Sequence, residues 1–202
     1  MESSKEFWNV DKNAGNLLQA LIFTHHPKHI LEIGTSNGYS AILMAKIAQQ
    51  YGGHITTIEY FEKRIALAQE NIAQAGLSDL ITVLQGDALE VLSRFSPSYE
   101  GELEGVLESK ATPTPASAGT PPYPGGRNMR FDFFFIDANK KQYAQYLEHC
   151  LRLANPGAII VADNTISHRN KLADFFAALE NNKTIRFIEL TIGTGLVIAQ
   201  VK

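Results

Sequence analysis

The sequence predicts an α/β fold in which helices cover a largely parallel β-sheet, and three observations support that prediction. Apolar, β-branched runs alternate with segments of helical periodicity along most of the 202 residues, as in βαβ units. Every such run ends in a glycine or a polar residue. The chain closes with two strand-like runs around "GTG" (Gly193 to Gly195) that leave no room for a crossover helix, so at least one strand is antiparallel.

Five of the runs, in chain order, are the expected parallel strands. "HILEIG" ends at Gly34, "HITTIEY" near Glu59, "LITVLQGDA" near Asp87, "FDFFFIDA" at Asp137, and "AIIVADN" at Asp163 and Asn164. In an open parallel sheet the carboxyl ends of the strands share one edge, and ligands bind beyond it. These residues therefore predict a binding site along that edge.

The segments between the runs have the pattern of helices. "YSAILMAKIAQQYGG" is closed by its two glycines, and "FEKRIALAQENIAQAG" places Ile65, Ala68 and Ile72 on one face before a capping Gly76. "ALEVLSRF", "QYAQYLEHCLRLA" and "KLADFFAALENN" supply later helices. Cys150, in the second of these, is expected to be a small buried hydrophobe.

Composition predicts one globular domain over residues 1–202 in the cytoplasm. A net charge of -3 gives no electrostatic case for nucleic acid or an acidic membrane surface. No segment approaches the roughly 20 apolar residues that span a bilayer, and a single cysteine allows no internal disulfide. The "HHPKH" cluster (His25 to His29) lacks a recognisable ligand spacing and is expected to be a surface turn.

One segment, residues 96–130, does not have the composition of the fold. It includes "SKATPTPASAGTPPYPGGRN", which is rich in Pro, Gly, Ser, Thr and Ala. Such a segment buries too little apolar surface to offset its ordering entropy, so we expect a disordered or loosely ordered surface insertion. A partner-binding loop is the alternative, because Pro-rich segments can dock as extended ligands.

The turn after the first strand, "EIGTSNGYS", favours a nucleoside ligand. Gly34 and Gly38 are spaced G-x-x-x-G, which is neither the dinucleotide fingerprint nor a phosphate P-loop. Glu59 follows about 25 residues after Gly34 and could accept hydrogen bonds from both ribose hydroxyls. Asp87 and Ala88 would lie beside an adenine, although Asp87 could equally cap the helix that follows.

Six stretches, taken together, resemble a known enzyme family. "LEIGTSNGYSAILMA", "TTIEY", "GDALEVL", "FFFIDANKKQY", "VADNTISH" and "IGTGLVIA" occur in the order seen in the cation-dependent S-adenosylmethionine O-methyltransferases. The chain is most similar to the short microbial members of the caffeoyl-CoA and catechol O-methyltransferase group. The resemblance implies a class I methyltransferase fold, a Rossmann-like doubly wound sheet of seven strands with the last antiparallel.

The resemblance also implies roles for individual residues. The residues around the methionine part of S-adenosylmethionine would be Glu32, Gly34, Thr35, Gly38 and Ser40, with Asp137 close by. Glu59 would hold the ribose. The adenine would be lined by Gly86, Asp87 and Ala88. Asp137, Asp163 and Asn164 would bind a divalent cation, and Lys140 falls on the catalytic lysine position.

Chemistry agrees with these implied roles. Two carboxylates and an amide oxygen form a hard oxygen site that suits Mg²⁺, with open positions for two adjacent hydroxyls of an aromatic acceptor. Lys140 could accept the acceptor's proton, or could stabilise its oxyanion instead. Two alternatives remain: Asp163 and Asn164 could simply cap a turn, and Lys140 could be an ordinary exposed lysine, like its neighbour Lys141.

The chain departs from the family at several positions. Asn139 stands where the family often has a second aspartate, which leaves the site one carboxylate poorer. Phe7 and Trp8 are expected to form a residual lid or a simple surface anchor. The short "TISHRN" after Asn164 favours small dihydroxylated aromatics over coenzyme A thioesters, with His168 as a candidate lining residue. The family often forms dimers, so a homodimer is possible.

Two other functions compete with methyl transfer. A cofactor-binding interaction module without catalysis would use the Pro-rich insertion for its partner. An NAD-dependent oxidoreductase is disfavoured by the glycine spacing of the first turn and by the terminal hairpin.

Overall fold

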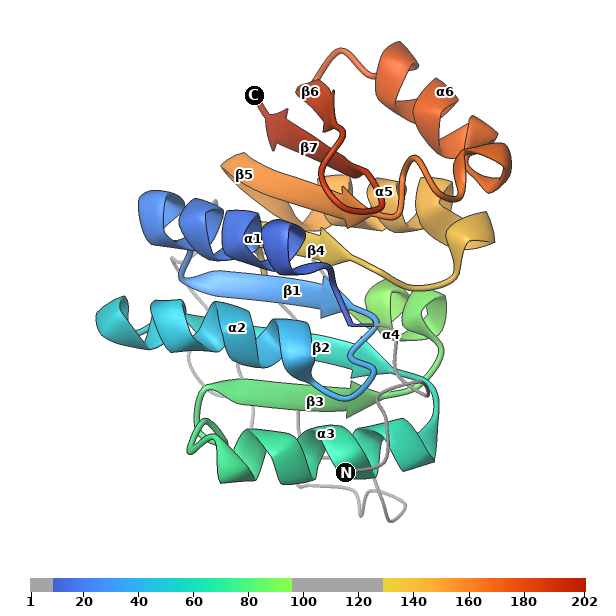
Figure 1. Ribbon diagram of the computed structural model, residues 1–202. Coiled ribbons are helices and arrows are strands. Elements are labelled where there is room, and N and C mark those ends of the chain that lie inside the picture. Colours follow the sequence, from blue (N-terminus) through green and yellow to red (C-terminus); the bar gives the residue numbers. More distant parts are fainter. Residues whose placement is uncertain (1–8, 96–128) are drawn as a thin grey trace, which may run out of the picture.

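The computed structural model describes residues 9–95 and 129–202, and it arranges them around one seven-stranded sheet (Figure 1). The strands lie in the order β3-β2-β1-β4-β5-β7-β6. Their bounds are β1 His29–Ile33, β2 His54–Glu59, β3 Ile81–Gln85, β4 Phe131–Ile136, β5 Ala154–Asp163, β6 Ile185–Leu190 and β7 Leu196–Val201.

Strand pairing confirms the class I topology. The pairs β1–β2, β2–β3, β1–β4 and β4–β5 are parallel, whereas β7 pairs antiparallel with both β5 and β6. The predicted terminal hairpin is therefore confirmed. The chain runs outward from β1 to β3 and then returns to place β4 beside β1, so the direction of winding changes between β1 and β4. Ligands bind at such a switch point in doubly wound sheets.

Helices cover both faces of the sheet. Figure 1 shows α1, α2 and α3 on the near face, with α4 and α5 behind it. The helix bounds are α1 Lys12–His25, α2 Tyr39–Ala48, α3 Glu62–Gln74, α4 Ala88–Arg94, α5 Tyr143–Leu153 and α6 Ala173–Asn181, with short 3₁₀ turns η1 Gln49–Tyr51, η2 Lys140–Gln142 and η3 Arg169–Lys171. Among the helices of the described part of the chain, none is long and apolar enough to cross a membrane.

The central strand β4 is buried on both faces, as its apolar run predicts. Phe133 and Phe135 pack into the core under α1, α2 and α3, whereas Phe134 and Ile136 pack into the core on the other face. This alternation of faces follows from the period of two in a strand. Burial of β4 fixes the point along the sheet at which the strand ends. It therefore fixes the position of Asp137, the residue that follows β4, at the edge of the sheet.

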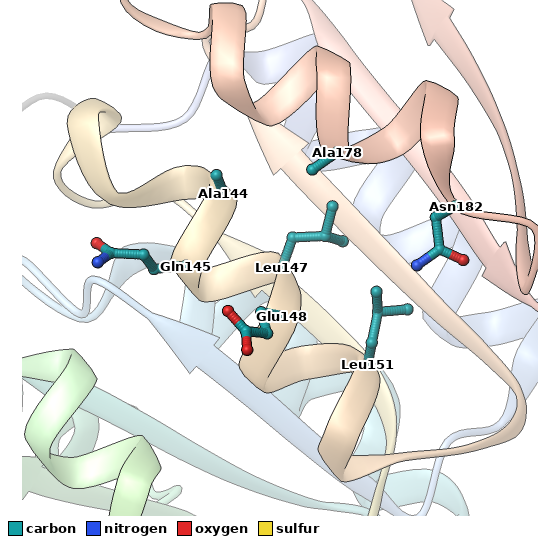
Figure 2. A pocket seen from close by; sticks show the side chains of 7 residues that line it. All are labelled: Ala144, Gln145, Leu147, Glu148, Leu151, Ala178 and Asn182. Carbon is teal, nitrogen blue, oxygen red and sulfur yellow. The ribbon is translucent and has the colours of Figure 1, made fainter.

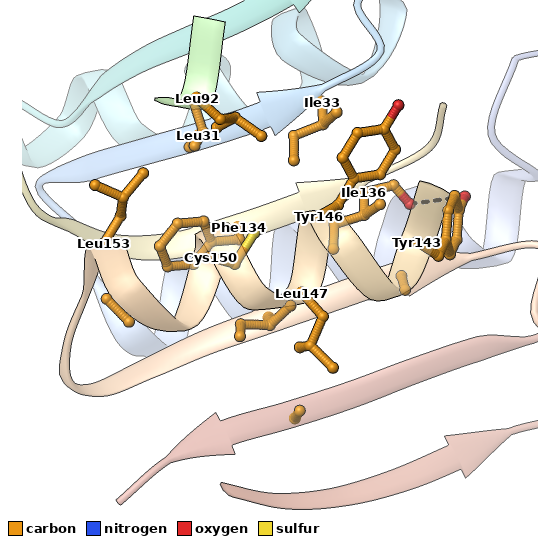
Figure 3. Close-up of a cluster of buried hydrophobic side chains, with 14 of the residues drawn as sticks. Leu31, Ile33, Leu92, Phe134, Ile136, Tyr143, Tyr146, Leu147, Cys150 and Leu153 are labelled. Atoms are coloured by element: carbon orange, nitrogen blue, oxygen red, sulfur yellow. Dashed lines mark hydrogen bonds between the residues drawn. The ribbon is translucent and has the colours of Figure 1, made fainter. Parts of the chain in front are cut away.

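Helix α5 fills the second face, and Figure 3 shows its buried side chains against the sheet. Tyr143, Leu147 and Cys150 recur at helical spacing and are all buried. The prediction of a buried Cys150 is confirmed, and burial raises the pKa of its thiol. The Tyr143 hydroxyl donates to the carbonyl of Ile136 at 3.2 Å, the dashed line in Figure 3, and also lies 3.2 Å from the carbonyl of Asp163.

Within the "HHPKH" segment, residues 26–28 form the predicted turn between α1, which ends at His25, and β1, which begins at His29. His26 caps α1 in the left-handed conformation, and His25 and His26 are exposed. In the described ranges, no group of three or more His, Cys, Asp or Glu side chains could hold a metal ion, and this includes these histidines. Phe7, Trp8 and nearly all of the insertion 96–130 lie outside the described residues.

Candidate active site

The carboxyl ends of β1, β4 and β5 lie at one level of the sheet edge. The parallel register places their last paired residues, Ile33, Ile136 and Ala162, side by side. Adjacent strands are about 4.8 Å apart, so Asp137 and Asp163, one residue further on, emerge close together. Burial raises the pKa of Asp163, and the nearby charge of Asp137 raises it further.

The first turn passes very close to the end of β4. A Cβ atom on Gly34 would lie 2.2 Å from the carbonyl oxygen of Asp137, and the φ of Gly34 is +104°. Gly38 begins α2 at φ +84°, where a Cβ would lie 3.3 Å from the Cβ of Ala68 on α3. Both glycines are thus needed for the packing of the chain itself. Their contact with a ligand stays a prediction.

Glu59 is fixed by backbone groups at the end of β2. One oxygen, Oε2, accepts the Ser36 N–H at 2.8 Å, and the other, Oε1, accepts the N–H groups of Tyr60 and Phe61 at 3.0 Å each. A carboxylate has about four lone-pair positions, so one remains on Oε2 for a further donor. The arrangement binds the first turn to the second strand and leaves Glu59 able to accept a hydroxyl.

Glu32 is a fully buried carboxyl group beside that turn. Its Oε2 accepts the Thr57 hydroxyl at 2.5 Å, and Thr57 in turn lies 2.6 Å from the hydroxyl of Thr35. Its Oε1 has no hydrogen-bond partner among the described residues, although the Ser40 hydroxyl is near enough to favour the ionised form. Burial raises the pKa of Glu32 to about 7, and the charge of Asp137 adds to this. A buried acceptor without a donor is unfavourable, so this oxygen suits a cationic ligand group.

Asp87 caps α4, so the capping alternative is confirmed. Its Oδ1 accepts the N–H of Leu89 at 2.9 Å and that of Glu90 at 3.3 Å. The preceding Gly86 donates its N–H to the carbonyl of Glu59 at 3.0 Å, which binds the third strand end to the second. Gly86, Asp87 and Ala88 are only partly buried, and a role in lining a ligand is compatible with the cap.

Lys140 and Asp137 form an ion pair at the end of β4. The Lys140 Nζ lies 2.7 Å from Asp137 Oδ1, and the two side chains are 15% and 21% exposed. Lys140 is therefore not an ordinary exposed lysine, whereas Lys141 is exposed. Asn139 caps the turn η2, because its side chain accepts the N–H of Lys141 at 3.2 Å. At the position where an aspartate is expected from the resemblance, Asn139 thus has a capping role.

The side chains of Asp163 and Asn164 are both hydrogen-bonded to the turn between β6 and β7. Oδ1 of Asp163 accepts the Asn164 N–H at 2.6 Å and the Thr194 hydroxyl at 2.8 Å. The amide Nδ2 of Asn164 donates to the same Thr194 oxygen at 2.8 Å. Asp163 is 1% exposed, and burial is the main reason that its pKa is raised. Asn164 itself has φ +63°, a left-handed conformation that asparagine tolerates better than most residues.

His168 lies near the ion pair. It is half-buried, and its Nδ1 lies 3.0 Å from the Ser167 hydroxyl. The pKa of His168 is lowered, first by partial burial and then by the charges of Lys140 and Lys171, while Asp137 opposes the shift. The imidazole is therefore within electrostatic range of the Asp137–Lys140 pair.

Three side-chain oxygens at this edge have no hydrogen-bond donor among the described residues: Asp137 Oδ2, Asp163 Oδ2 and Asn164 Oδ1. Two carboxylates and one amide are hard oxygen ligands of the kind that Mg²⁺ prefers, and Mg²⁺ usually keeps several waters besides. The residues therefore fit a divalent cation. Glu32 Oε1 and Glu59 Oε2 likewise fit the cationic and hydroxyl groups of S-adenosylmethionine.

Sequence reasoning missed three residues of this edge, Thr57, Tyr143 and Thr194. Thr57 could have been found, because a threonine inside a strand that is buried on both faces needs a hydrogen-bond partner. Tyr143 looks like any core aromatic of α5. Thr194 lies 31 residues from Asp163 along the chain, and no local pattern indicates that the two meet.

A separate hollow lies between α5 and α6 (Figure 2). Its volume is about 350 Å³, and the residues that line it are Ala144, Gln145, Leu147, Glu148, Leu151, Ala178 and Asn182. None of the predicted site residues is among them, and Glu148 is the one charged side chain among these described lining residues. This hollow is not part of the candidate active site.

Comparison with known proteins agrees with the geometry. Residues 31–165 match the family described as "Methyltransferase domain". The chain belongs to this methyltransferase family. It is 37% identical over 158 residues to a catechol O-methyltransferase of Niastella koreensis and 32% identical over 165 residues to one of Mycobacterium tuberculosis. These alignments cover 78% and 82% of the chain, but only 58% and 60% of the two relatives, so the chain spans less than two thirds of their length.

A solved structure extends the comparison to three dimensions. The O-methyltransferase from Bacillus cereus, in complex with SAH, has a TM-score of 0.73 and is 28% identical to the chain. The match covers 96% of this chain and 83% of that one. The expected class I methyltransferase fold and the resemblance to the catechol and caffeoyl-CoA O-methyltransferases are thereby confirmed.

Proposed function

We propose that the chain is an S-adenosylmethionine-dependent O-methyltransferase, which transfers a methyl group to a hydroxyl of a small vicinal-dihydroxy aromatic acceptor held by a divalent cation. The observation that carries the proposal is the Asp137–Lys140 pair beside the buried Asp163, at the strand switch point. A lysine next to two carboxylates provides both a group for the acceptor's proton and ligands for a cation.

The cofactor half of the proposal rests on the first turn and its two glutamates. Glu59 would accept one ribose hydroxyl through the remaining position on Oε2. Glu32 would face the methionine end, next to Gly34, Thr35, Gly38 and Ser40. Gly86, Asp87 and Ala88 would line the adenine. The SAH in the Bacillus cereus structure supports this ligand class, because SAH is what S-adenosylmethionine becomes when it gives up its methyl group.

The cation half rests on the oxygens of Asp137, Asp163 and Asn164 for which no described residue is a donor. Mg²⁺ is the proposed ion, because all three ligands are hard oxygens. When bound, such a cation supplies positive charge that favours the ionised form of an acceptor hydroxyl. The names of the relatives, which include catechol and caffeoyl-CoA O-methyltransferases, support an acceptor with neighbouring hydroxyls.

Lys140 is the proposed catalytic residue. As a neutral amine its Nζ would take the proton of the acceptor hydroxyl, and as an ammonium it would stabilise the oxyanion. Asp137 holds Nζ in place through Oδ1. The acceptor oxygen then bonds to the methyl carbon while the carbon–sulfur bond breaks and its electron pair stays on sulfur. The protein's main contribution to this step is to align oxygen, carbon and sulfur.

Methyl transfer from labelled S-adenosylmethionine to catechol and to phenol, with Mg²⁺ present, tests the proposal. We expect catechol to be methylated and phenol, which cannot offer two adjacent oxygens, to be methylated far more slowly. Equal rates would contradict the vicinal acceptor. Tight binding of S-adenosylmethionine without transfer to any diol would instead favour the non-catalytic interaction module. The NAD-dependent oxidoreductase has lost its support, because the chain belongs to the methyltransferase family.

A further inference from the structure

We infer that Thr194, in the turn between β6 and β7, is a positioning residue that orients Asn164 and Asp163 for the cation. The inference rests on the proposed function, because it concerns the same cation site. Thr194 does not belong to the ligand set itself. It lies 30 residues from Asn164 along the chain, yet one hydroxyl contacts both side chains at 2.8 Å.

The direction of these hydrogen bonds follows from counting protons. An ionised carboxylate can only accept, so the single proton of the Thr194 hydroxyl must point to Asp163 Oδ1. Thr194 then has only lone pairs left for Asn164, and the group facing it must be the donor Nδ2. The carbonyl oxygen of the amide therefore points away from Thr194 and is left free for a cation.

The same hydroxyl decides which oxygen of Asp163 remains available. Oδ1 accepts both the Thr194 hydroxyl and the backbone N–H of Asn164. Oδ2 has no donor among the described residues, so it is the oxygen that could bind a cation. One threonine thus sets the orientation of two of the three proposed ligands.

The backbone holds the turn in place independently of the Thr194 side chain. The carbonyl of Thr194 accepts the N–H groups of Ile166 and Ser167 at 3.1 and 3.0 Å, and the carbonyl of Gly195 accepts the Thr165 N–H at 3.0 Å. A Cβ on Gly195 would lie 2.5 Å from the Ile166 nitrogen, so the two loops are in close contact. Because Thr194 is exposed and its backbone is anchored, a change of its side chain should leave the fold intact.

The consequence of losing the hydroxyl is specific. The bond to Thr194 is the one hydrogen bond of the Asn164 side chain among the described residues, so without it the amide is free to rotate and present Nδ2, which cannot bind a cation. Removal of a group that orients a metal ligand typically weakens metal binding by about 10- to 100-fold. We expect Thr194→Val to lose this much affinity, and Thr194→Ser, which keeps the hydroxyl, to remain within about threefold of the wild type.

The test is a titration of the protein with Mn²⁺, followed by the electron paramagnetic resonance signal of the free ion. This readout needs no turnover and no acceptor. Thr165→Val is the matched control. Thr165 follows Asn164 directly, and its buried hydroxyl has no hydrogen-bond partner in the described part of the chain. Calorimetric binding of S-adenosylmethionine and thermal denaturation of each variant show that the rest of the site and the fold persist. Thr194→Ala provides a second loss of the hydroxyl should the valine variant not fold.

The inference is supported if Thr194→Val, or Thr194→Ala in its place, binds Mn²⁺ about 10-fold or more weakly while Thr194→Ser and Thr165→Val stay near the wild type. It is overturned if Thr194→Val binds Mn²⁺ as the wild type does, or if Thr194→Ser binds as weakly as Thr194→Val. Those results leave the proposed methyl transfer standing. A wild type that binds S-adenosylmethionine but not Mn²⁺ would instead overturn the cation site, and the inference with it.

Discussion

The carboxylates at the ends of β1 and β2 are held differently from those at the ends of β4 and β5. Glu59 accepts three backbone N–H groups, and Glu32 accepts a buried hydroxyl from the neighbouring strand. Asp137 is instead held by a lysine, and Asp163 by one backbone N–H and one hydroxyl from a distant turn.

The two halves therefore differ in how much of their charge is already compensated by the chain itself. Backbone donors need little reorganisation, so Glu59 is already held in place without a ligand. At β4 and β5, burial and the charge of Asp137 both raise the pKa of Asp163, and among the described residues Lys140 alone forms an ion pair there. A bound cation would therefore stabilise the half at β4 and β5.

The largest expected effect is in the half at β4 and β5. Lys140→Met should slow methyl transfer by about 10²- to 10⁴-fold, because it removes the group that takes or stabilises the acceptor's charge. The KM for S-adenosylmethionine should change little. Steady-state kinetics with catechol and Mg²⁺ provides the measurement.

Lys141→Met is the matched control for this prediction. Lys141 is the next residue, it is exposed, and no ion pair involves it among the described residues. Similar losses in the two variants would mean that net charge, rather than the position of Lys140 beside Asp137, matters at this edge.

A second prediction concerns stability in the half at β1 and β2. The pKa of Glu32 is about 7 in the folded chain against 4.5 for the free side chain, so folding favours the protonated form. As the pH rises from 4.5 to 7 the unfolded chain ionises first, and the wild type loses about 3 kcal/mol of unfolding free energy. Glu32→Gln, which cannot ionise, should not show this loss.

Denaturant unfolding of both proteins at pH 5 and at pH 8 measures the effect. We expect the stability of Glu32→Gln relative to the wild type to rise between these two values. A difference that does not depend on pH would show that Glu32 is already ionised at pH 5, and that the nearby hydroxyls of Ser40 and Thr57 outweigh its burial.

The smallest of the three effects concerns cofactor affinity. Glu59→Gln should weaken S-adenosylmethionine binding by about 10- to 100-fold, since hydrogen bonds to a charged group contribute about 1.5–3 kcal/mol. The loss should be the same with and without Mg²⁺, because Glu59 is not a proposed cation ligand. Glu62→Gln, an exposed residue in the first turn of α3, is the control. Calorimetry in which Glu59→Gln binds as the wild type does would remove Glu59 from the ribose site.

Much of the fold and the backbone of the site could be predicted from the sequence, because local patterns encode them. The apolar run of β4 indicates a strand buried on both faces, and such a strand fixes where Asp137 emerges. Lys140 follows at a spacing that one short turn brings back to Asp137. Glu59 and Asp163 are found in the same way, since each ends an apolar run.

What could not be predicted depends on contacts between distant segments. Thr194 reaches Asp163 and Asn164 only because β7 pairs antiparallel with β5, and turn residues carry no mark of this contact. The sequence shows that Asn139 replaces an expected aspartate, but not that its side chain caps the next turn. The strand β5 begins at Ala154, directly after α5 and several residues before its apolar run. This early part of β5 is a strand because Ala154 pairs with Phe131, after which the register shifts.

The comparison of the two halves is tested most directly by removing divalent cations from the wild type. Binding of S-adenosylmethionine and transfer of its methyl group to catechol are measured in the same EDTA-treated sample, before and after addition of Mg²⁺. We expect the cofactor to bind in both conditions, whereas methyl transfer is lost in EDTA and restored by Mg²⁺. Methyl transfer at an undiminished rate in EDTA would contradict it.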